Sequence, residues 1–510
     1  MKNLFLNWPL YPLLLAAYPP VALYLFNPAD ATVLAATTAL LVCLLLAAIL
    51  WGGINLWLRN PARSALITTV VLILFFSYGH IHAYFTGAIH GTALADYTWQ
   101  WHLVLSLFWL LILRLVWLGI RRWQESTLTE ITPLMNATAL VFLALPFITS
   151  PPWGGPERIQ AHEIIEQAPE EAATHALGYA PDIYLIVLDG YARGDYLETH
   201  YDFDNSPFLD SLQDKGFFIA EQSQANYYWT FLSFFSSLNM QHITWLSEEM
   251  GEDSRERGPV YDGIRDNKVA RFLADNGYEI VHFNSTWGAT RNNPYADREI
   301  QCSSLIFHEE FYRVLWETTW LRIFDDGASF DLAQCWLSHM EQLAKMGQEP
   351  GPKFVFAHFM PPHHPYLFDR EGNILRHATI SNQFQFQENL WEDHDAYIEQ
   401  LRFLNRAFLE IIEQVLETSD NPPVILLQSD HGPHLKRASR GRNHTLRMAN
   451  LMAMHLPGTP EGLVSDDITL VNQFPLILNH YFGTDFEIQS DTLYYSEYHT
   501  PYLFQEIKTD

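Results

Sequence analysis

The chain has 510 residues, of which 30 are basic and 58 acidic, and its formal net charge is −28. Such an acidic chain is a poor partner for nucleic acid, and its length allows two or three domains. Hydrophobic residues make up 48% and charged residues 17%, which excludes a disordered chain and a simple cytosolic enzyme. Residues 1–150 hold only six of the basic and four of the acidic side chains, which leaves a net charge of −30 on residues 151–510.

Five apolar stretches lie in residues 1–150, each near or above the roughly 20 residues that cross a bilayer core. They are Leu4–Phe26, Ala31–Leu58, Ser64–Phe85, Trp101–Ile120 and Ile131–Thr149. Prolines interrupt the first and the last, so these two are the weakest candidates. A soluble all-α domain would rarely contain five such stretches in succession, and no small-residue cleavage site of a signal peptide follows the first. We therefore expect a transmembrane domain of about five helices over residues 1–150.

The arginines between these stretches predict the orientation. Arg59 and Arg63 lie between the second and third stretches, and Arg121 and Arg122 lie between the fourth and fifth. The other two links contain neither lysine nor arginine. Because positive residues mark the cytoplasmic side, we expect the N-terminus inside the cell and the acidic two-thirds of the chain outside the cytoplasm.

The chain contains three cysteines. Cys43 falls within the second apolar stretch, which leaves Cys302 and Cys335 in the part expected to be exported. In an oxidising compartment these two could form one disulfide or remain separate thiols, and the sequence leaves both open. We predict the disulfide.

The part that follows the apolar third has the pattern of an α/β domain. Residues 151–180 begin with prolines and glycines and continue rich in Glu and Ala, as in a linker. From residue 181 on, apolar runs of strand length alternate with helical patterns. The predicted strands are Ile183–Leu188, Glu279–Asn284, Lys353–His358, Val424–Ser429 and Asn450–Leu456. This alternation predicts that residues 181–510 form a mostly parallel sheet covered by helices on both faces.

Two of the predicted strands end in similar polar motifs. Asp189 and Gly190 follow the first strand, and Asp430, His431 and Gly432 follow the strand that begins at Val424. An isolated Asp-Gly is more often only a turn, but Asp-His-Gly directly after an apolar strand is much rarer by chance. Carboxylates and a histidine at the carboxyl ends of parallel strands can converge on one divalent cation. We therefore expect a metal site at this edge of the sheet.

A hydroxyl and a group of histidines lie between these two motifs. Thr230 opens an apolar helix predicted over Phe231–Met240, where it could be an ordinary N-cap or a nucleophile that faces a phosphate at the helix N-terminus. By itself the N-cap is the more common arrangement. His358, His363 and His364 fall within seven residues that also contain prolines, a pattern that packing does not readily explain.

The order of these motifs resembles the alkaline phosphatase superfamily, and in particular its sulfatase-like branch. That branch includes the lipoteichoic acid synthases and the lipid A phosphoethanolamine transferases, which are similar in having five membrane spans before an exported α/β domain. The resemblance implies an N-terminal five-helix transmembrane domain, a linker over residues 151–180 and a sulfatase-like catalytic domain over residues 181–510. It also implies a multi-pass protein of the bacterial inner membrane whose catalytic domain is periplasmic.

The resemblance further implies the metal ligands. Carried over by motif, they are Asp189, Thr230, Asp430 and His431, with Thr230 also the nucleophile. Three oxygens and one nitrogen suit Zn²⁺ or Mn²⁺, with Mg²⁺ as the alternative. At the first of these positions the two named transferases commonly have Glu, which is one methylene longer than the Asp of this chain.

Histidines are expected to complete the catalytic site. In the resemblance, His363 would contact the transferred group, and His444 would complete the site, with His434 as its alternative. The roles of His358 and His364 stay open. Where the teichoic acid synthases have a histidine after a Gly-Tyr turn, this chain has Asn284, so their glycerol phosphate donor is in doubt here.

These features lead to one expected function and two alternatives. We expect a transferase that moves a phosphoethanolamine- or phosphoglycerol-type group from a membrane lipid onto an envelope lipid or glycan through a covalent threonine. A hydrolase of phosphodiesters or sulfate esters would use the same site, and a degenerate domain would serve as an envelope scaffold. The Cys/Ser-x-Pro-x-Arg signature of formylglycine sulfatases is absent, because Cys302 is followed by Ser-Ser-Leu-Ile. The oligomeric state is not readable from the sequence.

Overall fold

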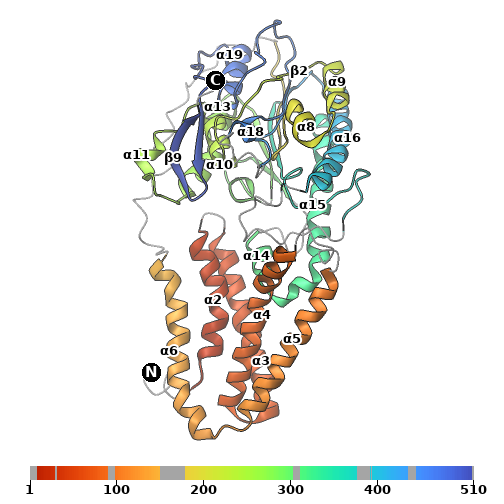
Figure 1. Ribbon diagram of the computed structural model, residues 1–510. Helices are drawn as coiled ribbons and strands as arrows, with labels where there is room; N and C mark the ends of the chain where they lie inside the picture. Colours follow the sequence, from red (N-terminus) through yellow and green to blue (C-terminus); the bar gives the residue numbers. More distant parts are fainter. Residues whose placement is uncertain are drawn as a thin grey trace. The chain divides into compact units, whose positions relative to one another are not determined.

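The computed structural model describes residues 8–28, 31–89, 98–149, 178–285, 287–301, 310–375, 391, 393–434 and 444–507. Most of the expected linker and Cys302 lie outside these residues. The elements follow one another as shown in Figure 1. The helices are α2 (Tyr11–Phe26), α3 (Val33–Leu58), α4 (Pro61–Ile89), α5 (Thr98–Ile120), α6 (Glu125–Thr149), α8 (Gly194–Tyr201), α9 (Ser206–Asp214), α10 (Thr230–Asn239), α11 (Leu246–Met250), α12 (Gly258–Arg265), α13 (Lys268–Asp275), α14 (Glu310–Thr318), α15 (Asp325–Lys345), α16 (His394–Thr418), α18 (Thr445–Met448) and α19 (Gln473–Phe482), with short 3₁₀ turns η1 (Gly288–Thr290), η2 (Trp320–Phe324), η3 (Met346–Gln348) and η5 (Leu470–Asn472). The strands are β1 (Ile183–Leu188), β2 (Phe217–Ile219), β3 (Glu279–Phe283), β4 (Arg298–Ile300), β5 (Lys353–Phe359), β6 (Val424–Gln428), β7 (Met452–His455), β8 (Leu493–Glu497) and β9 (Thr500–Ile507).

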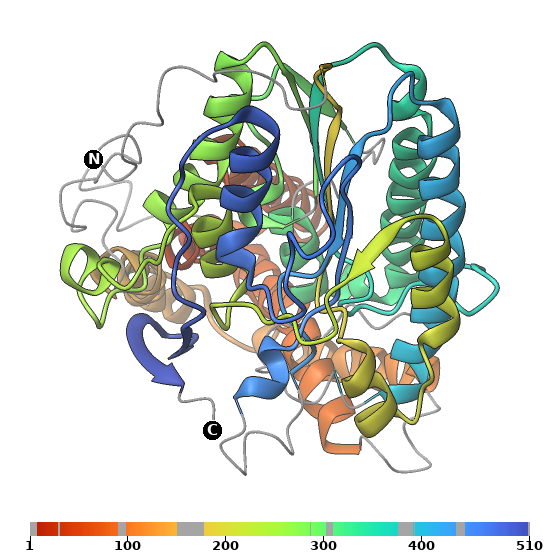
Figure 2. The same ribbon diagram turned by 90° about the horizontal axis from the view of Figure 1, so that it is seen from above.

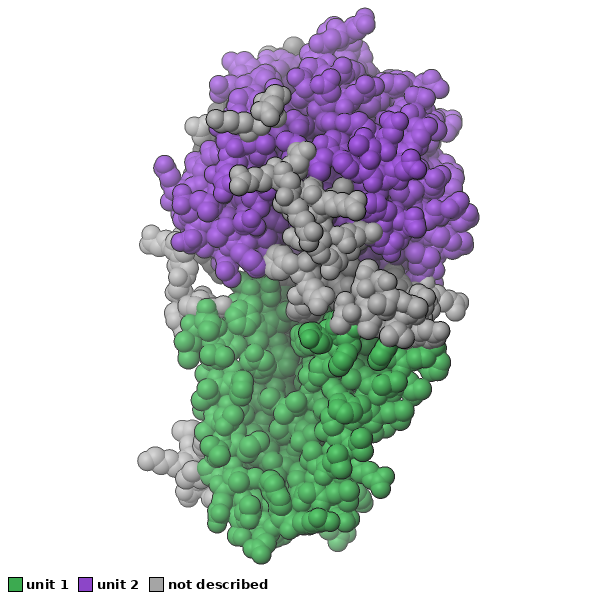
Figure 3. Space-filling model, viewed as in Figure 1, with its two compact units in different colours: residues 1–155, 309–328 green, residues 156–308, 329–510 purple. Residues whose placement is uncertain are grey.

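The chain divides into two compact units (Figure 3). The first unit contains residues 1–155 and 309–328, and the second contains residues 156–308 and 329–510. Residues 309–328 are thus interposed in the sequence of the α/β unit but pack with the N-terminal helices.

The first unit is built of long apolar helices. Within the part of the chain that the structure describes, four helices are long and apolar enough to cross a membrane: Val33–Leu58, Pro61–Phe85, Trp99–Ile120 and Glu125–Thr149. The described part of the first predicted span is α2, a shorter apolar helix of 16 residues. Large apolar side chains such as Leu34 and Leu56 are exposed along these helices, as expected for surfaces that face lipid.

The two links that carry arginines lie together at one end of the helix bundle. Arg63 donates from Nη2 to the backbone oxygen of Trp123 at 2.8 Å, and Asn60 donates from Nδ2 to Glu125 Oε1 at 2.9 Å. The positive residues of both links are therefore on the same side of the bundle, as the charge rule requires.

Helix α14 packs closely against the apolar helices of the first unit. Phe311 of α14 is buried in a cluster with Ala31, Ala35 and Ala39. Gly79 of α4 lies so near to the end of α14 that a Cβ atom built on it would be 1.8 Å from the backbone oxygen of Glu317. Only a residue without a side chain allows these two backbones to approach each other.

This contact predicts that Gly79→Ala destabilises the first unit. The added methyl group would force α14 away from α4, at a cost of about 2 kcal/mol or more. We expect a clearly lower melting temperature for the full-length variant in detergent. Gly53→Ala is the matched control, since nothing lies within 4 Å of a Cβ on Gly53. Equal melting temperatures of the two variants would contradict this packing.

A seven-stranded sheet forms the centre of the second unit, in the order β2-β7-β6-β1-β5-β3-β4. Strands β6, β1, β5, β3 and β4 are parallel, whereas β7 pairs antiparallel with both β6 and β2. The prediction of a mostly parallel α/β sheet is confirmed, and β1 has the predicted bounds. The predictions did not include β2 and β4, which have three residues each, or the separate hairpin of β8 and β9.

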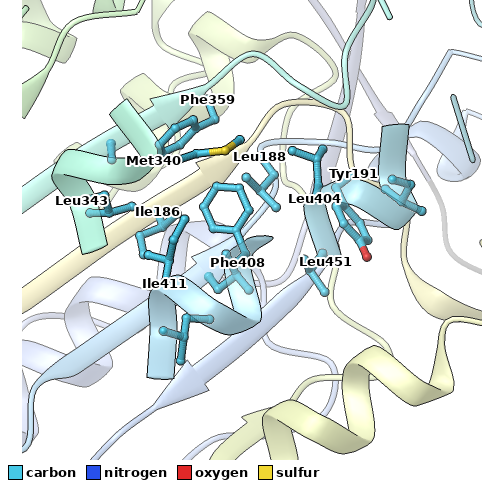
Figure 4. Close-up of a cluster of buried hydrophobic side chains, with 14 of the residues drawn as sticks. Ile186, Leu188, Tyr191, Met340, Leu343, Phe359, Leu404, Phe408, Ile411 and Leu451 are labelled. Atoms are coloured by element: carbon cyan, nitrogen blue, oxygen red, sulfur yellow. The ribbon is translucent and has the colours of Figure 1, made fainter. Parts of the chain in front are cut away.

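Helices cover both faces of this sheet, as the view in Figure 2 shows. Alternate residues of β1 and β5, such as Ile186 and Phe359, pack against α15 and α16. Figure 4 shows this core, in which Phe408 of α16 lies among Ile186, Met340 and Phe359. The intervening residues of β5 face α10 and α19, where Phe356 contacts Phe234 and Phe354 contacts Phe474.

Candidate active site

The acidic motifs of the sequence meet at one edge of the sheet. Strands β1 and β6 are parallel neighbours, with Val187 opposite Gln428, so the residues that follow them lie at the same edge. The ligand atoms of Asp189, Asp430 and His431 all lie within 4.8 Å of one another. All three side chains are almost fully buried. The expectation that these strand ends converge is therefore met in the geometry.

Gly190 holds the two strand ends together. Its backbone N–H donates to Asp430 Oδ1 at 3.1 Å, and its φ of 71° is a left-handed conformation that favours glycine. A Cβ atom built on Gly190 would lie 2.5 Å from a ring carbon of Trp391. Both the backbone conformation and the close approach of Trp391 therefore require glycine at position 190, which an ordinary Asp-Gly turn would not.

Gly190→Ala should therefore destabilise the protein more than a glycine substitution at another left-handed position. Gly277 is the matched control, since its φ is 84° and nothing lies within 4 Å of its Cβ position. We expect about 1 kcal/mol for Gly277→Ala and about 3 kcal/mol for Gly190→Ala, because only the latter adds a clash to the strain. Melting temperatures of the two variants measure the difference, and similar values would refute the close contact with Trp391.

Thr230 is placed in the site and not in a helix cap. It is the first residue of α10, and the N-cap is Trp229, whose side chain makes no capping hydrogen bond. Thr230 Oγ1 lies 3.0 Å from His431 Nε2, and the same hydroxyl is near enough to Asp430 to lower the pKa of that carboxyl, against the larger rise that burial causes. Ser233, one turn along, donates instead to the backbone oxygen of Asp430 at 2.8 Å. Of the two hydroxyls, only that of Thr230 is bonded to the side chains of the acidic and histidine cluster.

His431 presents a nitrogen lone pair to the site. Its Nδ1 lies 2.9 Å from the backbone oxygen of Gly432, and since a carbonyl can only accept, Nδ1 carries the proton. Burial and the charge of Arg447 hold the pKa of His431 well below its ordinary value, so the ring is neutral. Its Nε2 therefore faces Thr230 Oγ1 and lies 3.2 Å from Asp430 Oδ2.

The two carboxylates favour a bound cation. Burial raises the pKa of both Asp189 and Asp430, and the charge of Asp189 raises that of Asp430 further. Among the described residues, Asp189 Oδ1 and Asp430 Oδ2 are buried and accept no hydrogen bond. Two unsatisfied carboxylate oxygens, a histidine lone pair and a hydroxyl form a donor set that suits a divalent metal ion. The residues present thus fit the metal that the resemblance implies.

His358 lies beside Asp189. Its Nε2 lies 3.3 Å from Asp189 Oδ2, and its Nδ1 lies 2.8 Å from Thr290 Oγ1, which is in turn bonded to Ser285. The sequence left the role of His358 open. Its place near the end of β5, the parallel neighbour of β1, is the signal that could have assigned it to this edge.

Arg447 is the site residue that the sequence reasoning missed. Its Nη2 donates to His431 Nε2 at 2.8 Å, and its Nε donates to the backbone oxygen of Tyr228 at 2.9 Å. Arg447 is only 6% exposed. It is the last of several basic residues between His434 and Asn450, and no motif distinguished it from the others.

The three histidines expected to complete the site lie around it. Burial lowers the pKa of His363, the nearby charge of Asp189 partly opposes this, and His363 Nδ1 donates to the backbone oxygen of His364 at 2.6 Å. His444 stacks on Tyr495 of β8 with ring centroids 3.8 Å apart. His434 and His444 both lie edge-on to the ring of Tyr228, at 5.9 and 6.0 Å. Neither belongs to the cluster of Asp189, Asp430 and His431 within the described residues.

The described cysteines fit an exported second unit. Cys335 of α15 is disulfide-bonded, and Cys43 of α3 is a free, buried thiol. Cys302, its predicted partner, lies outside the described residues, so this pairing stays a prediction.

The family model described as Sulfatase matches residues 181–504, which is more than half of the chain. The chain belongs to the sulfatase family. The resemblance stated for the sequence is therefore confirmed, and the family match covers the α/β unit that holds the site. No curated protein matches this sulfatase-family chain.

Solved structures similar to this sulfatase-family chain include three from bacteria. The C-terminal periplasmic domain of EptC from Escherichia coli, in complex with Zn, is 13% identical, with 64% of this chain and 93% of that chain covered and a TM-score of 0.39. The soluble domain of lipooligosaccharide phosphoethanolamine transferase A from Neisseria meningitidis is 12% identical (62% and 92% covered, TM-score 0.39). The lipoteichoic acid synthase LtaP from Listeria monocytogenes is 13% identical (61% and 76% covered, TM-score 0.35).

Proposed function

We propose that this protein is a membrane-anchored, metal-dependent transferase that moves a phospho-alcohol group through a covalent intermediate on Thr230. The observation that carries the proposal is the position of the Thr230 hydroxyl. It lies 3.0 Å from His431 Nε2, at the N-terminus of α10 and beside two buried carboxylates. A hydroxyl that served only the helix would instead cap a backbone N–H.

The metal would be held by Asp189, Thr230, Asp430 and His431. We expect Zn²⁺ or Mn²⁺ in preference to Mg²⁺. When bound, a divalent cation would lower the pKa of the Thr230 hydroxyl and polarise an oxygen of the transferred group. His358 Nε2 lies 3.3 Å from Asp189 Oδ2, beside this ligand, and the hydrogen bond from His431 Nδ1 to the backbone oxygen of Gly432 keeps His431 Nε2 unprotonated.

The remaining chemistry belongs to the side chains around the site. Thr230 Oγ forms a bond to phosphorus, the bond from phosphorus to the leaving alcohol breaks, and the proton of Thr230 passes through a histidine to that alcohol. An acceptor alcohol then attacks phosphorus, gives its proton to the histidine and releases Thr230, which regains a proton. His363 and His444 are the histidines we assign to these transfers. Burial lowers the pKa of both, which suits a neutral base at pH 7.

The apolar helices favour a lipid donor at the membrane surface. We propose that the N-terminus is cytoplasmic and that the α/β unit lies outside the cytoplasm, in the periplasm of a bacterial inner membrane. The arginines at one end of the bundle support this orientation. A reporter enzyme fused after Asp510 should be active only outside the cytoplasm, and cytoplasmic activity would refute the orientation.

The test of the function uses the purified full-length protein with labelled phosphatidylethanolamine or phosphatidylglycerol. With a glycan or lipid acceptor, we expect release of diacylglycerol and transfer of the label to the acceptor. Without an acceptor, we expect the label on the peptide that contains Thr230, found by mass spectrometry. If the label is released only to water, the protein is a hydrolase and not a transferase. If the metal-loaded protein neither forms the adduct nor consumes the lipids, this result would favour the alternative of a non-catalytic envelope scaffold.

A further inference from the structure

Arg447 of α18 is a buried cation that contacts the site through His431. Its guanidinium lies over the rings of Tyr228 and Trp229, at 5.1 and 5.2 Å from their centroids. Its two hydrogen bonds within the described residues go to neutral acceptors, Tyr228 O and His431 Nε2. No carboxylate among these residues forms an ion pair with it, although the charges of Asp430 and Asp189 act on it from farther away.

A buried charge without a direct counter-ion is costly, and proteins rarely keep one for packing alone. In this case the two rings and the carbonyl of Tyr228 hold the guanidinium in one orientation, with Nη2 directed toward His431. The arrangement therefore fixes at the site a cation that is not paired with a carboxylate of the described residues.

His431 Nε2, which accepts the hydrogen bond from Arg447, is also expected to bind the metal ion. His431 Nε2 has a single lone pair, which Arg447 Nη2 and Thr230 Oγ1 both approach, at 2.8 and 3.0 Å. This is the lone pair that would bind a metal ion. If His431 Nε2 held a metal ion, the Nη2–H of Arg447 would lose this acceptor and be available to a ligand near the hydroxyl of Thr230.

We propose that Arg447 is a catalytic residue that binds a non-bridging oxygen of the tetrahedral anion transferred through Thr230. The inference rests on the proposed function and adds the group that recognises the anion. A guanidinium suits this task because its N–H groups form strong, directional hydrogen bonds to phosphate oxygens. Its fixed positive charge also stabilises the negative charge of the transferred group in the transition state. The ligand we expect is an ester of a tetrahedral anion. We propose a phosphodiester, and a sulfate ester is the alternative.

The test uses the full-length, metal-loaded protein and inorganic phosphate as the probe. In Arg447→Gln we expect phosphate affinity to fall by about 10-fold or more and turnover by about 100-fold, with metal content unchanged. Turnover is measured on bis(4-nitrophenyl) phosphate and on 4-nitrophenyl sulfate, which separates the two esters. Arg447→Lys should recover part of the phosphate affinity because it restores a charge but not the planar fork.

Arg257→Gln is the matched control. Arg257 is likewise stacked, between Phe231 and Tyr498, and donates to the hydroxyl of Tyr498, but it has no contact with His431 in the described residues. We expect this variant to lose stability and to keep its phosphate affinity. If Arg447→Gln does not fold, Arg447→Met keeps the apolar stem against Tyr228 and Trp229, and the same losses are expected.

The outcomes separate this inference from the proposed function. Wild-type phosphate affinity and turnover in folded, metal-loaded Arg447→Gln or Arg447→Met would overturn the role of Arg447 and leave the transferase intact. A wild-type protein that binds metal but neither phosphate nor either ester would overturn both.

Discussion

Replacing Thr230 by alanine should abolish turnover while the protein stays folded. If Thr230 carries the covalent intermediate, its loss removes the reacting atom, and we expect turnover to fall by at least about 10⁴-fold. The stability cost should be no more than about 1 kcal/mol, because the hydroxyl makes hydrogen bonds within the site and does not cap α10. Lipid turnover and the melting temperature of the full-length variant are the two measurements.

Two further variants make this experiment decisive. Thr230→Ser keeps the hydroxyl and should retain part of the activity. Ser233→Ala is the matched control, since Ser233 lies one turn along the same helix and its hydroxyl donates to backbone oxygens of Tyr227 and Asp430. It should lose about 1 kcal/mol of stability and keep most of its turnover. Full activity of Thr230→Ala, or a covalent adduct on Ser233, would disprove the assignment.

Asp430→Asn should have opposite effects on stability with and without metal. In the metal-free protein, Asp189 and Asp430 are buried close together; burial raises the pKa of both, and the charge of Asp189 raises the pKa of Asp430 further. Removing one charge should therefore leave the metal-free variant at least as stable as the wild type. The amide oxygen can still accept the hydrogen bond from Gly190 N–H, so the strand ends stay joined.

With metal present the order should reverse. A ligand at 100 times its dissociation constant adds about 2.7 kcal/mol to the stability of the protein that binds it. We expect the wild type to gain this amount from Zn²⁺ or Mn²⁺, and Asp430→Asn to bind the metal more than about 100-fold more weakly. Melting temperatures with metal and with chelator, together with metal analysis, measure both effects.

Asp195→Asn is the control for this prediction, because Asp195 is half-exposed and pairs with Arg193 away from the buried cluster. It should bind metal like the wild type. A wild type that chelator does not destabilise, or an Asp430→Asn variant that binds metal as well as the wild type does, would contradict the proposed metal site.

Much of the fold could be predicted because the signals are local. Strand β1 is a continuous apolar run with both faces buried, so its bounds follow from its own residues. The four long helices likewise follow from hydropathy. Strands of three residues, such as β2 and β4, lack a pattern of their own and form only because longer neighbours pair with them.

The two carboxylates of the site could also be predicted from local sequence. Asp189 and Asp430 come directly after strands, and once the sheet is parallel, adjacent strand ends must share an edge. The sequence alone could not choose between an N-cap and a nucleophile for Thr230. That choice depends on the approach of His431, 201 residues away in the chain, to its hydroxyl.

By itself the sequence determined the apolar helices, the α/β class and the strand-end motifs, because each is encoded in residues adjacent in the chain. Only the tertiary structure decided that His358 lies beside Asp189, that Arg447 contacts His431, and that residues 309–328 pack with the N-terminal helices. These arrangements join segments far apart in sequence, and the side chains involved have no repeating pattern. Their positions follow from the packing of whole elements, which no local stretch of the chain encodes.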